Sequence, residues 1–280
     1  MLTKRLNLLM KMNRFVIFIL VVLLASPVYA GRARANKTVI KYTEDDTIAE
    51  IRFGRNLAAR ILGEIKTWDN EKVSDYVNII GTGLASQMGR PDLKFKFAVL
   101  DSPEINAYAI PGGYIFITRG AIQLMENEAQ LVGALAHEIA HINHRHIVKK
   151  INLRGQSNAF LSSLGVAAGG GAVSGATLLD KLLDEAADLL FEIGVEKKFE
   201  TDSDLEAVKI MIALNYDWRS YVRFLEKIDN ETYQNRRTIN SKTHPPLAER
   251  IEQIEAEAGK FATETFNGRK HQKRFHEKTH

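Results

Sequence analysis

One short motif constrains the fold of this chain more than any other feature: H-E-x-x-H at residues 137–141, inside the apolar run 131–141. The surrounding residues are good helix formers and include no proline, so the run is predicted to be a buried helix. On a helix His137 and His141 lie one turn apart on one face, where both imidazoles can bind a single ion. Two imidazoles are typical ligands of Zn²⁺, and Glu138 is placed to act as the general base on a zinc-bound water.

Two histidines leave such a site one protein ligand short. His144 follows on the same helix, but it lies two turns, roughly 10 Å, from His137 and does not reach an ion between the other two. Glu200 and Asp204 are one helical turn apart, so Glu200 is a candidate third ligand while Asp204 accepts the ring N–H of a ligand histidine. Spacing alone leaves other glutamates open as the third ligand, namely Glu185, Glu192, Glu196 and Glu206.

The N-terminus has the pattern of a secretory signal peptide. Four basic residues precede the apolar run 15–24, and Val28 and Ala30 occupy the small-residue positions of a cleavage site. Cleavage is predicted after Ala30; an uncleaved N-terminal anchor is the alternative. Residues 1–30 hold four of the 38 basic residues and no acid, so the remainder carries 34 basic and 34 acidic residues. That balance gives no support to a nucleic-acid partner.

The rest of the chain is predicted to form one domain, α+β and mostly helical, over residues 31–260. The hydrophobic periodicity predicts helices at 44–66, 70–88, 120–125, 128–150, 178–195, 198–215, 217–228 and 246–258. Alternating apolar residues predict strands at 94–101, 106–110 and 114–118, which form a small antiparallel sheet beside the H-E-x-x-H helix.

Two segments stand outside this domain pattern. Residues 261–280 form a basic tail that is predicted to be solvated and disordered. Residues 155–177 are rich in Gly, Ala and Ser and are interpreted as a linker near the cleft, or as a hydrophobic loop in peripheral contact with a membrane.

Four ordered blocks resemble the gluzincin metallopeptidases that include the HtpX-, BepA- and LoiP-type enzymes and the CAAX prenyl proteases. The blocks are N-A-x-x-x-P-G-G at 106–113, H-E-x-x-H with Arg-His at 145–146, E-x-x-x-D at 200–204, and T-H-P-x-x-x-x-R at 243–250. The E-x-x-x-D block departs from the family pattern, because it has Asp202 and Ser203 where the family commonly has Glu-Ala. The chain also resembles a minimal secreted member, without transmembrane helices or a helical-repeat domain.

The resemblance implies one zinc ion per chain, with His137, His141 and Glu200 as ligands, Glu138 as base and Asp204 supporting a ligand histidine. It implies a zinc endopeptidase of the periplasm that hydrolyses misfolded or misassembled cell-envelope proteins and contacts the envelope assembly machinery. The alternative is a chaperone-like assembly factor that binds such clients and cleaves them rarely. A structural zinc site is disfavoured because it would need no base.

Further residues are candidates for substrate and transition-state binding. His244 and Arg250 are candidate oxyanion donors, and His244 is also a candidate inhibitory ligand at the open metal position. If 114–118 is an edge strand, an extended peptide can pair with Tyr114 and Ile115 by main-chain hydrogen bonds. Asn106 and Gly113 flank that block and are interpreted as substrate-binding residues or as parts of a structural turn.

Overall fold

The computed structural model describes residues 41–154, 173–235, 247–263 and 265–280. The chain divides into two units, residues 1–41 and residues 42–280, and the second holds nearly all of the described residues. The predicted signal peptide, most of the glycine-rich segment and His244 lie outside the described residues. Within the described part, no helix has the length and hydropathy needed to cross a bilayer.

Two helices precede the sheet, as predicted. Helix α2 (Glu44–Glu64) begins with a capping box, in which Thr43 and Asp46 each bond the other's backbone N–H. Helix α3 (Glu71–Met88) begins at the side-chain cap of Asn70 on the backbone N–H of Val73.

The sheet has three strands, β1 (Lys96–Leu100), β2 (Ala107–Ile110) and β3 (Tyr114–Thr118), in the order β1-β3-β2. The predicted wholly antiparallel pairing is wrong: β2 and β3 are antiparallel, but β1 and β3 are parallel. The reason is the central position of β3. Because β1 and β2 run in opposite directions, a strand between them that is antiparallel to one must be parallel to the other.

A tight hairpin joins β2 to β3 through Pro111, Gly112 and Gly113. Both glycines have positive φ, 79° and 94°. A Cβ on Gly112 would lie 2.9 Å from the Cα of Ile51, so this turn lies directly against α2 and requires glycine.

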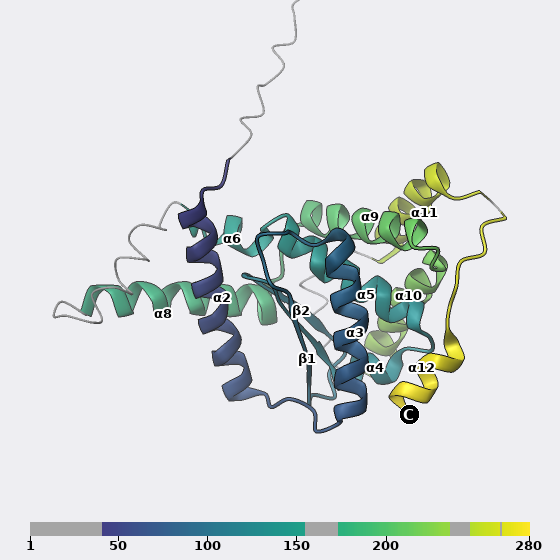
Figure 1. Cartoon of the computed structure of the whole chain (residues 1–280), viewed down its shortest axis with the longest axis horizontal. Helices are drawn as coiled ribbons and strands as arrows, with labels where there is room; N and C mark the ends of the chain where they lie inside the picture. Colours follow the sequence, from purple (N-terminus) through teal and green to yellow (C-terminus); the bar gives the residue numbers. More distant parts are fainter. Residues whose placement is uncertain (1–40, 155–172, 236–246, 264) are drawn as a thin grey trace, which may run out of the picture. The chain divides into compact units, whose positions relative to one another are not determined.

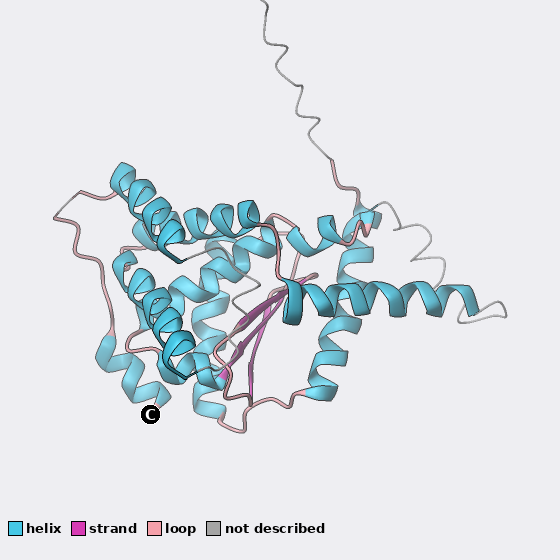
Figure 2. Cartoon of the chain, turned by 180° about the vertical axis from the view of Figure 1, so that it is seen from behind, coloured by secondary structure: helices cyan, strands magenta, loops and turns pink. Residues whose placement is uncertain are grey.

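Helices cover both faces of the sheet. Ile115 and Ile117 of β3 face a core that includes α3 and the central helix α5 (Glu128–Asn143). Phe116, between them, faces a second core that includes α2 and α8 (Val173–Asp188). Figure 1 shows α2 and α8 on one side of the strands and α3, α5 and α10 (Trp218–Asn235) on the other, and Figure 2 shows the same layers from behind. The predicted mostly helical α+β class is confirmed.

Helix α5 is the centre of the larger core: 14 of its 16 residues are buried. It is preceded by α4 (Arg119–Leu124) and followed by α6 (His146–Lys150), whereas the sequence predicted one helix over 128–150. The break lies at Arg145, whose φ of 55° and ψ of 43° are left-handed and end the α-helical path.

The remaining elements complete the described fold. They are the π-helical turn η2 (Leu189–Ile193), α9 (Lys197–Ala213), α11 (Leu247–Phe261) and α12 (Gln272–Thr279). Helices α9 and α10 both contact α5 directly, and α11 contacts α9.

The basic tail differs from its prediction. Residues 272–279 form α12, and Phe275 is fully buried in the larger core. Arg274 forms a salt bridge with Glu128, which is also fully buried. One buried aromatic side chain and one ion pair with a buried carboxylate therefore order a segment whose basic residues are exposed.

Candidate metal centre

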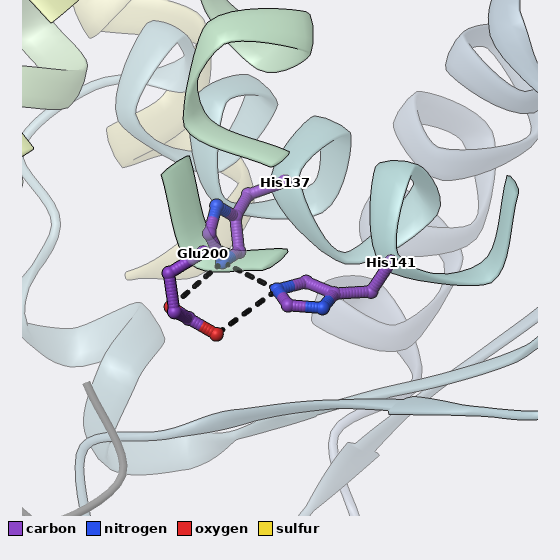
Figure 3. A group of neighbouring side chains, drawn as sticks. All are labelled: His137, His141 and Glu200. Atoms are coloured by element: carbon purple, nitrogen blue, oxygen red, sulfur yellow. Dashed lines mark hydrogen bonds and ion pairs between the residues drawn. The ribbon is translucent and has the colours of Figure 1, made fainter. Parts of the chain in front are cut away.

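Helix α5 brings the two histidines of the H-E-x-x-H motif together. The Nε2 atoms of His137 and His141 lie 3.0 Å apart, and the residues are 4% and 7% exposed. Both rings project from one face of the helix, as their spacing predicted, and Figure 3 shows their Nε2 atoms converging.

Helix α9 supplies the carboxylate opposite these rings. The carboxylate oxygens of Glu200 lie 3.6 Å from Nε2 of His137 and 3.3 Å from Nε2 of His141 (Figure 3). One possible ligand atom from each of the three residues lies within 4.8 Å of the ligand atoms of the other two. Within the described residues, no other group of three His, Cys, Asp or Glu side chains meets this condition.

The other glutamates that spacing left open have different surroundings. Glu206 lies 2.6 Å from Nε2 of His144, and Glu196 pairs with Lys150 at 3.2 Å. Glu185 is exposed on α8. The side chain of Glu192 lies outside what the structure describes.

The three side chains fit a zinc ion. Zinc–nitrogen and zinc–oxygen bonds of ~2.0–2.1 Å at a tetrahedral angle place neighbouring ligand atoms roughly 3.3 Å apart. The observed separations of 3.0, 3.3 and 3.6 Å lie on both sides of that value. The donor set of two imidazoles and one glutamate is also one that catalytic zinc sites use.

The electrostatics of the cluster favour a positive charge. Burial opposes protonation of His137, but the carboxylates of Asp204 and Glu200 outweigh it and raise its pKa to about 10. A divalent cation between the same groups supplies that positive charge in place of the proton.

Asp204 holds His137 from the side away from the cluster. Its Oδ1 lies 2.9 Å from Nδ1 of His137. Burial opposes the ionisation of Asp204, but Arg250 outweighs it and holds the pKa of the carboxyl well below its usual range. The ionised carboxylate fixes the ring so that Nε2 faces Glu200.

Arg250 is oriented toward Asp204. Its Nε and Nη2 donate to the two oxygens of Asp204 at 2.7 and 2.8 Å, and its side chain is 9% exposed. The bidentate pair directs Nε and Nη2 of the guanidinium at Asp204, so this geometry gives no support to the oxyanion role predicted for Arg250.

Tyr221 of α10 is a site residue that sequence reasoning missed. Its hydroxyl donates to Oδ1 of Asp204 at 2.8 Å, and its ring packs against Gly133 on α5. A Cβ on Gly133 would lie 2.6 Å from that ring. The signal that could have found it is the glycine itself, one turn before His137 in a helix that otherwise has larger apolar residues.

His146 is a second residue that was missed in this role. Its Nδ1 lies 2.8 Å from Nδ1 of His141, and the residue is 1% exposed. Burial lowers its pKa to about 2. His144, by contrast, lies at the end of α5 on Glu206, away from the three clustered side chains, in agreement with its exclusion from the ligand set.

Glu138 follows His137 on a different side of α5 and is half-buried. Its charge contributes, after burial and Glu104, to raising the pKa of Tyr108 on β2. Strand β2 is one of the strands in contact with α5.

The strand residues take a different place from the one predicted. Strand β3 is paired on both sides, so Tyr114 and Ile115 do not lie on an edge strand. Asn106 and Gly113 both bond neighbouring strands: the carbonyl of Asn106 accepts from the N–H of Thr118, and that of Gly113 accepts from the N–H of Lys96. Both positions thus have structural backbone roles.

Residues 71–258 match the model of the family described as Peptidase family M48. The matched segment contains α5 and α9 and therefore all three clustered side chains.

Two curated relatives agree with that family match. A protein named beta-barrel assembly-enhancing protease, from Escherichia coli O157:H7, is 25% identical over 203 residues, which cover 70% of this chain and 41% of the relative. Mitochondrial metalloendopeptidase OMA1 of Schizosaccharomyces pombe is 29% identical over 181 residues, 64% of this chain and 51% of the relative. The chain thus spans about half or less of the length of these relatives.

Proposed function

Because the chain belongs to peptidase family M48 and is a metalloprotease, we propose that it is a zinc endopeptidase that cleaves misfolded or misassembled proteins of the cell envelope. The observation that carries the proposal is the buried cluster of His137, His141 and Glu200 on α5 and α9. That cluster lies inside the segment that matches the family.

His137, His141 and Glu200 are the proposed ligands of one zinc ion per chain. Bound there, zinc supplies Lewis-acid activation of a water molecule and of the scissile carbonyl. Asp204 keeps the His137 ring oriented, and Arg250 and Tyr221 keep Asp204 ionised and in place. The low exposure of all three ligands excludes bulk water from the cluster.

Glu138 is the proposed general base. Its carboxylate takes a proton from the attacking water as the oxygen bonds to the scissile carbonyl carbon. The same carboxyl then gives that proton to the leaving amine as the C–N bond breaks. The half-buried position of Glu138 beside His137 and the contact of α5 with β2 support this role.

Substrate binding is assigned to β2 in place of β3. Strand β2 pairs with β3 on one side, and its other edge has no strand partner among the described residues. An extended peptide can add to that edge through main-chain hydrogen bonds, which require little sequence preference. Unfolded segments of envelope proteins meet this requirement, whereas folded proteins do not present extended backbone.

The cellular setting follows from the N-terminal pattern and the relatives. A signal peptide over residues 1–30 would deliver the chain to the periplasm. The E. coli relative's name links a protease to beta-barrel assembly, which supports envelope substrates and contact with assembly machinery for this chain.

The test is cleavage of an unfolded protein together with metal content. The purified protein should contain one zinc per chain and cleave fluorescent casein. Glu138→Gln should retain zinc and lose at least about 100-fold in rate, because general-base catalysis contributes that much. Glu185→Gln on exposed α8 is the matched control and should cleave normally. Full activity of Glu138→Gln would overturn the assigned base.

A chaperone-like assembly factor is the second candidate, because the same relative's name describes enhancement of assembly. Complementation by Glu138→Gln separates the two. If envelope assembly is restored by a variant that retains zinc and cannot cleave, client binding is the main function; if it is not restored, hydrolysis is.

A further inference from the structure

His146 lies beside the metal cluster without belonging to the ligand set. It is 1% exposed and follows His141 by five residues. On a continuous helix, five residues correspond to a rotation of ~140°, so the two side chains would point in different directions. Their Nδ1 atoms are nevertheless 2.8 Å apart.

Arg145 makes this approach possible. It is the left-handed residue between α5 and α6, so the chain leaves the helical path there and the ring of His146 lies against His141. Its Nε donates to Glu50 at 3.0 Å, and Glu50, 1% exposed, also binds Arg90 at 2.7 Å. A left-handed arginine is strained, and this buried ion pair holds it in that conformation.

The contact between the two rings requires one donor and one acceptor. Nε2 of His141 faces His137 and Glu200, so in a ligand its lone pair points there and its proton sits on Nδ1. That N–H then donates to Nδ1 of His146. For His141, His146 has the place that Asp204 has for His137.

His146 also touches the other ligand-bearing helix. Its ring stacks on Phe199, with centroids 4.2 Å apart and planes 8° from parallel. Phe199 directly precedes Glu200 on α9. One buried ring thus contacts a ligand of α5 and the neighbour of the ligand on α9.

We propose that His146 is a positioning residue for the metal site, accepting the Nδ1–H of His141 while its stack on Phe199 holds the ring in place. The inference rests on the zinc site proposed above. Its consequence is that zinc affinity depends on an acceptor at position 146, separately from the stability of the fold.

Two comparisons separate the effect of the hydrogen-bond acceptor from the effect of packing. The first sets the natural protein against His146→Phe, and the second sets His146→Asn against His146→Leu. His146→Phe retains a ring that can stack on Phe199 and removes the acceptor. His146→Asn and His146→Leu have nearly the same shape and both lose the stack, but only asparagine offers an acceptor. His276→Phe, at an exposed histidine on α12, is the matched control.

The measurements are zinc dissociation constants by competition with a chelator, the visible spectrum of the Co²⁺-substituted proteins, and the thermal midpoint of each metal-free protein. His146→Phe should bind zinc about 10–100-fold more weakly at an unchanged midpoint, with an altered Co²⁺ spectrum. His146→Asn should bind more tightly than His146→Leu by about tenfold, although both have a lowered midpoint. His276→Phe should match the natural protein in zinc affinity.

Two results overturn the proposal: wild-type zinc affinity in His146→Phe, or equal affinities in the Asn and Leu variants. If His146→Phe does not fold, the Asn and Leu pair still decides. If the natural protein itself binds no zinc, the proposed zinc site and this inference fail together, whereas zinc binding that is insensitive to position 146 removes only the inference.

Discussion

Arg274, on the last helix of the chain, binds Glu128, the first residue of α5, across 146 positions of sequence. Glu128 is fully buried, and its oxygens also accept from the hydroxyls of Tyr76 at 2.5 Å and Tyr216 at 2.7 Å. The helix that carries two proposed zinc ligands therefore begins at a buried carboxylate whose cationic partner comes from α12.

Removal of this partner should destabilise the protein. In Arg274→Ala, Glu128 is left as a buried charge without a cation, which costs ~3–5 kcal/mol for a fully buried pair. Because the Arg274 side chain is 48% exposed, we expect a smaller loss of unfolding free energy, roughly 1–3 kcal/mol. Urea unfolding measures it. Lys273→Ala, at a side chain 91% exposed, should change stability little; equal losses in both variants would contradict the assignment.

The same pair predicts a pH dependence. Burial opposes the ionisation of Glu128, but Arg274 and the two tyrosines outweigh it and lower its pKa. A carboxyl with a lowered folded-state pKa contributes stability that is fully present above its unfolded pKa of ~4.3 and is lost as pH falls through the folded value.

Thermal melts at pH 7 and pH 3 check this. The difference in midpoint between the natural protein and Arg274→Ala should be largest at pH 7 and narrow at pH 3, because burial without arginine raises the pKa of Glu128 in the variant. A difference that stays constant over this range would show that Glu128 is not the titrating partner.

Arg250→Met distinguishes two roles for Arg250: the oxyanion donor that the sequence analysis predicted, and the partner of Asp204. In the structure its guanidinium binds Asp204, which is 1% exposed. Loss of the guanidinium should therefore lower the stability of the metal-free protein by ~1–3 kcal/mol, because His137 and Tyr221 still face the buried carboxylate. Arg119→Met is the control, since Arg119 pairs with a half-exposed Asp101 and should cost under about 1 kcal/mol. Unchanged stability with a reduced kcat would favour the oxyanion role.

How much of this site was predictable depends on sequence separation. His137, Glu138 and His141 lie within one helical turn, so the geometry of a helix fixes their relation and the spacing was sufficient. Glu200 is on another helix, where spacing left several glutamates open and the resemblance to a family selected it. Arg274 and Glu128 are farther apart still, and a basic tail gives no local signal of a buried partner.

Backbone irregularities limited the rest. The parallel pairing of β1 with β3 depends on which strand is central, and strand patterns alone do not contain that order. His146 was missed because Arg145 leaves the helical path, so helical spacing misplaces every residue beyond it. In both cases the missing information was the path that the chain takes between elements.

Gly133 offers the sharpest test of how α10 supports the site. Replacing a helical glycine by alanine normally stabilises by ~0.5–1 kcal/mol, because the unfolded chain loses freedom. At Gly133, however, the new Cβ would lie 2.6 Å from the ring of Tyr221, which donates to Asp204. Overpacking of this kind costs ~1–3 kcal/mol, so Gly133→Ala should be destabilised on balance.

Gly83→Ala is the matched control, since nothing lies within 4 Å of a Cβ at that position on α3, and this variant should be stabilised. Because a displaced Tyr221 also loosens Asp204 and the ring of His137, Gly133→Ala should bind zinc more weakly while Gly83→Ala does not. Calorimetric unfolding measures the stability of the two variants, and competition with a chelator measures their zinc affinity. If both variants are stabilised and bind zinc equally well, Tyr221 moves without disturbing Asp204, and α10 contributes packing but does not support the metal centre.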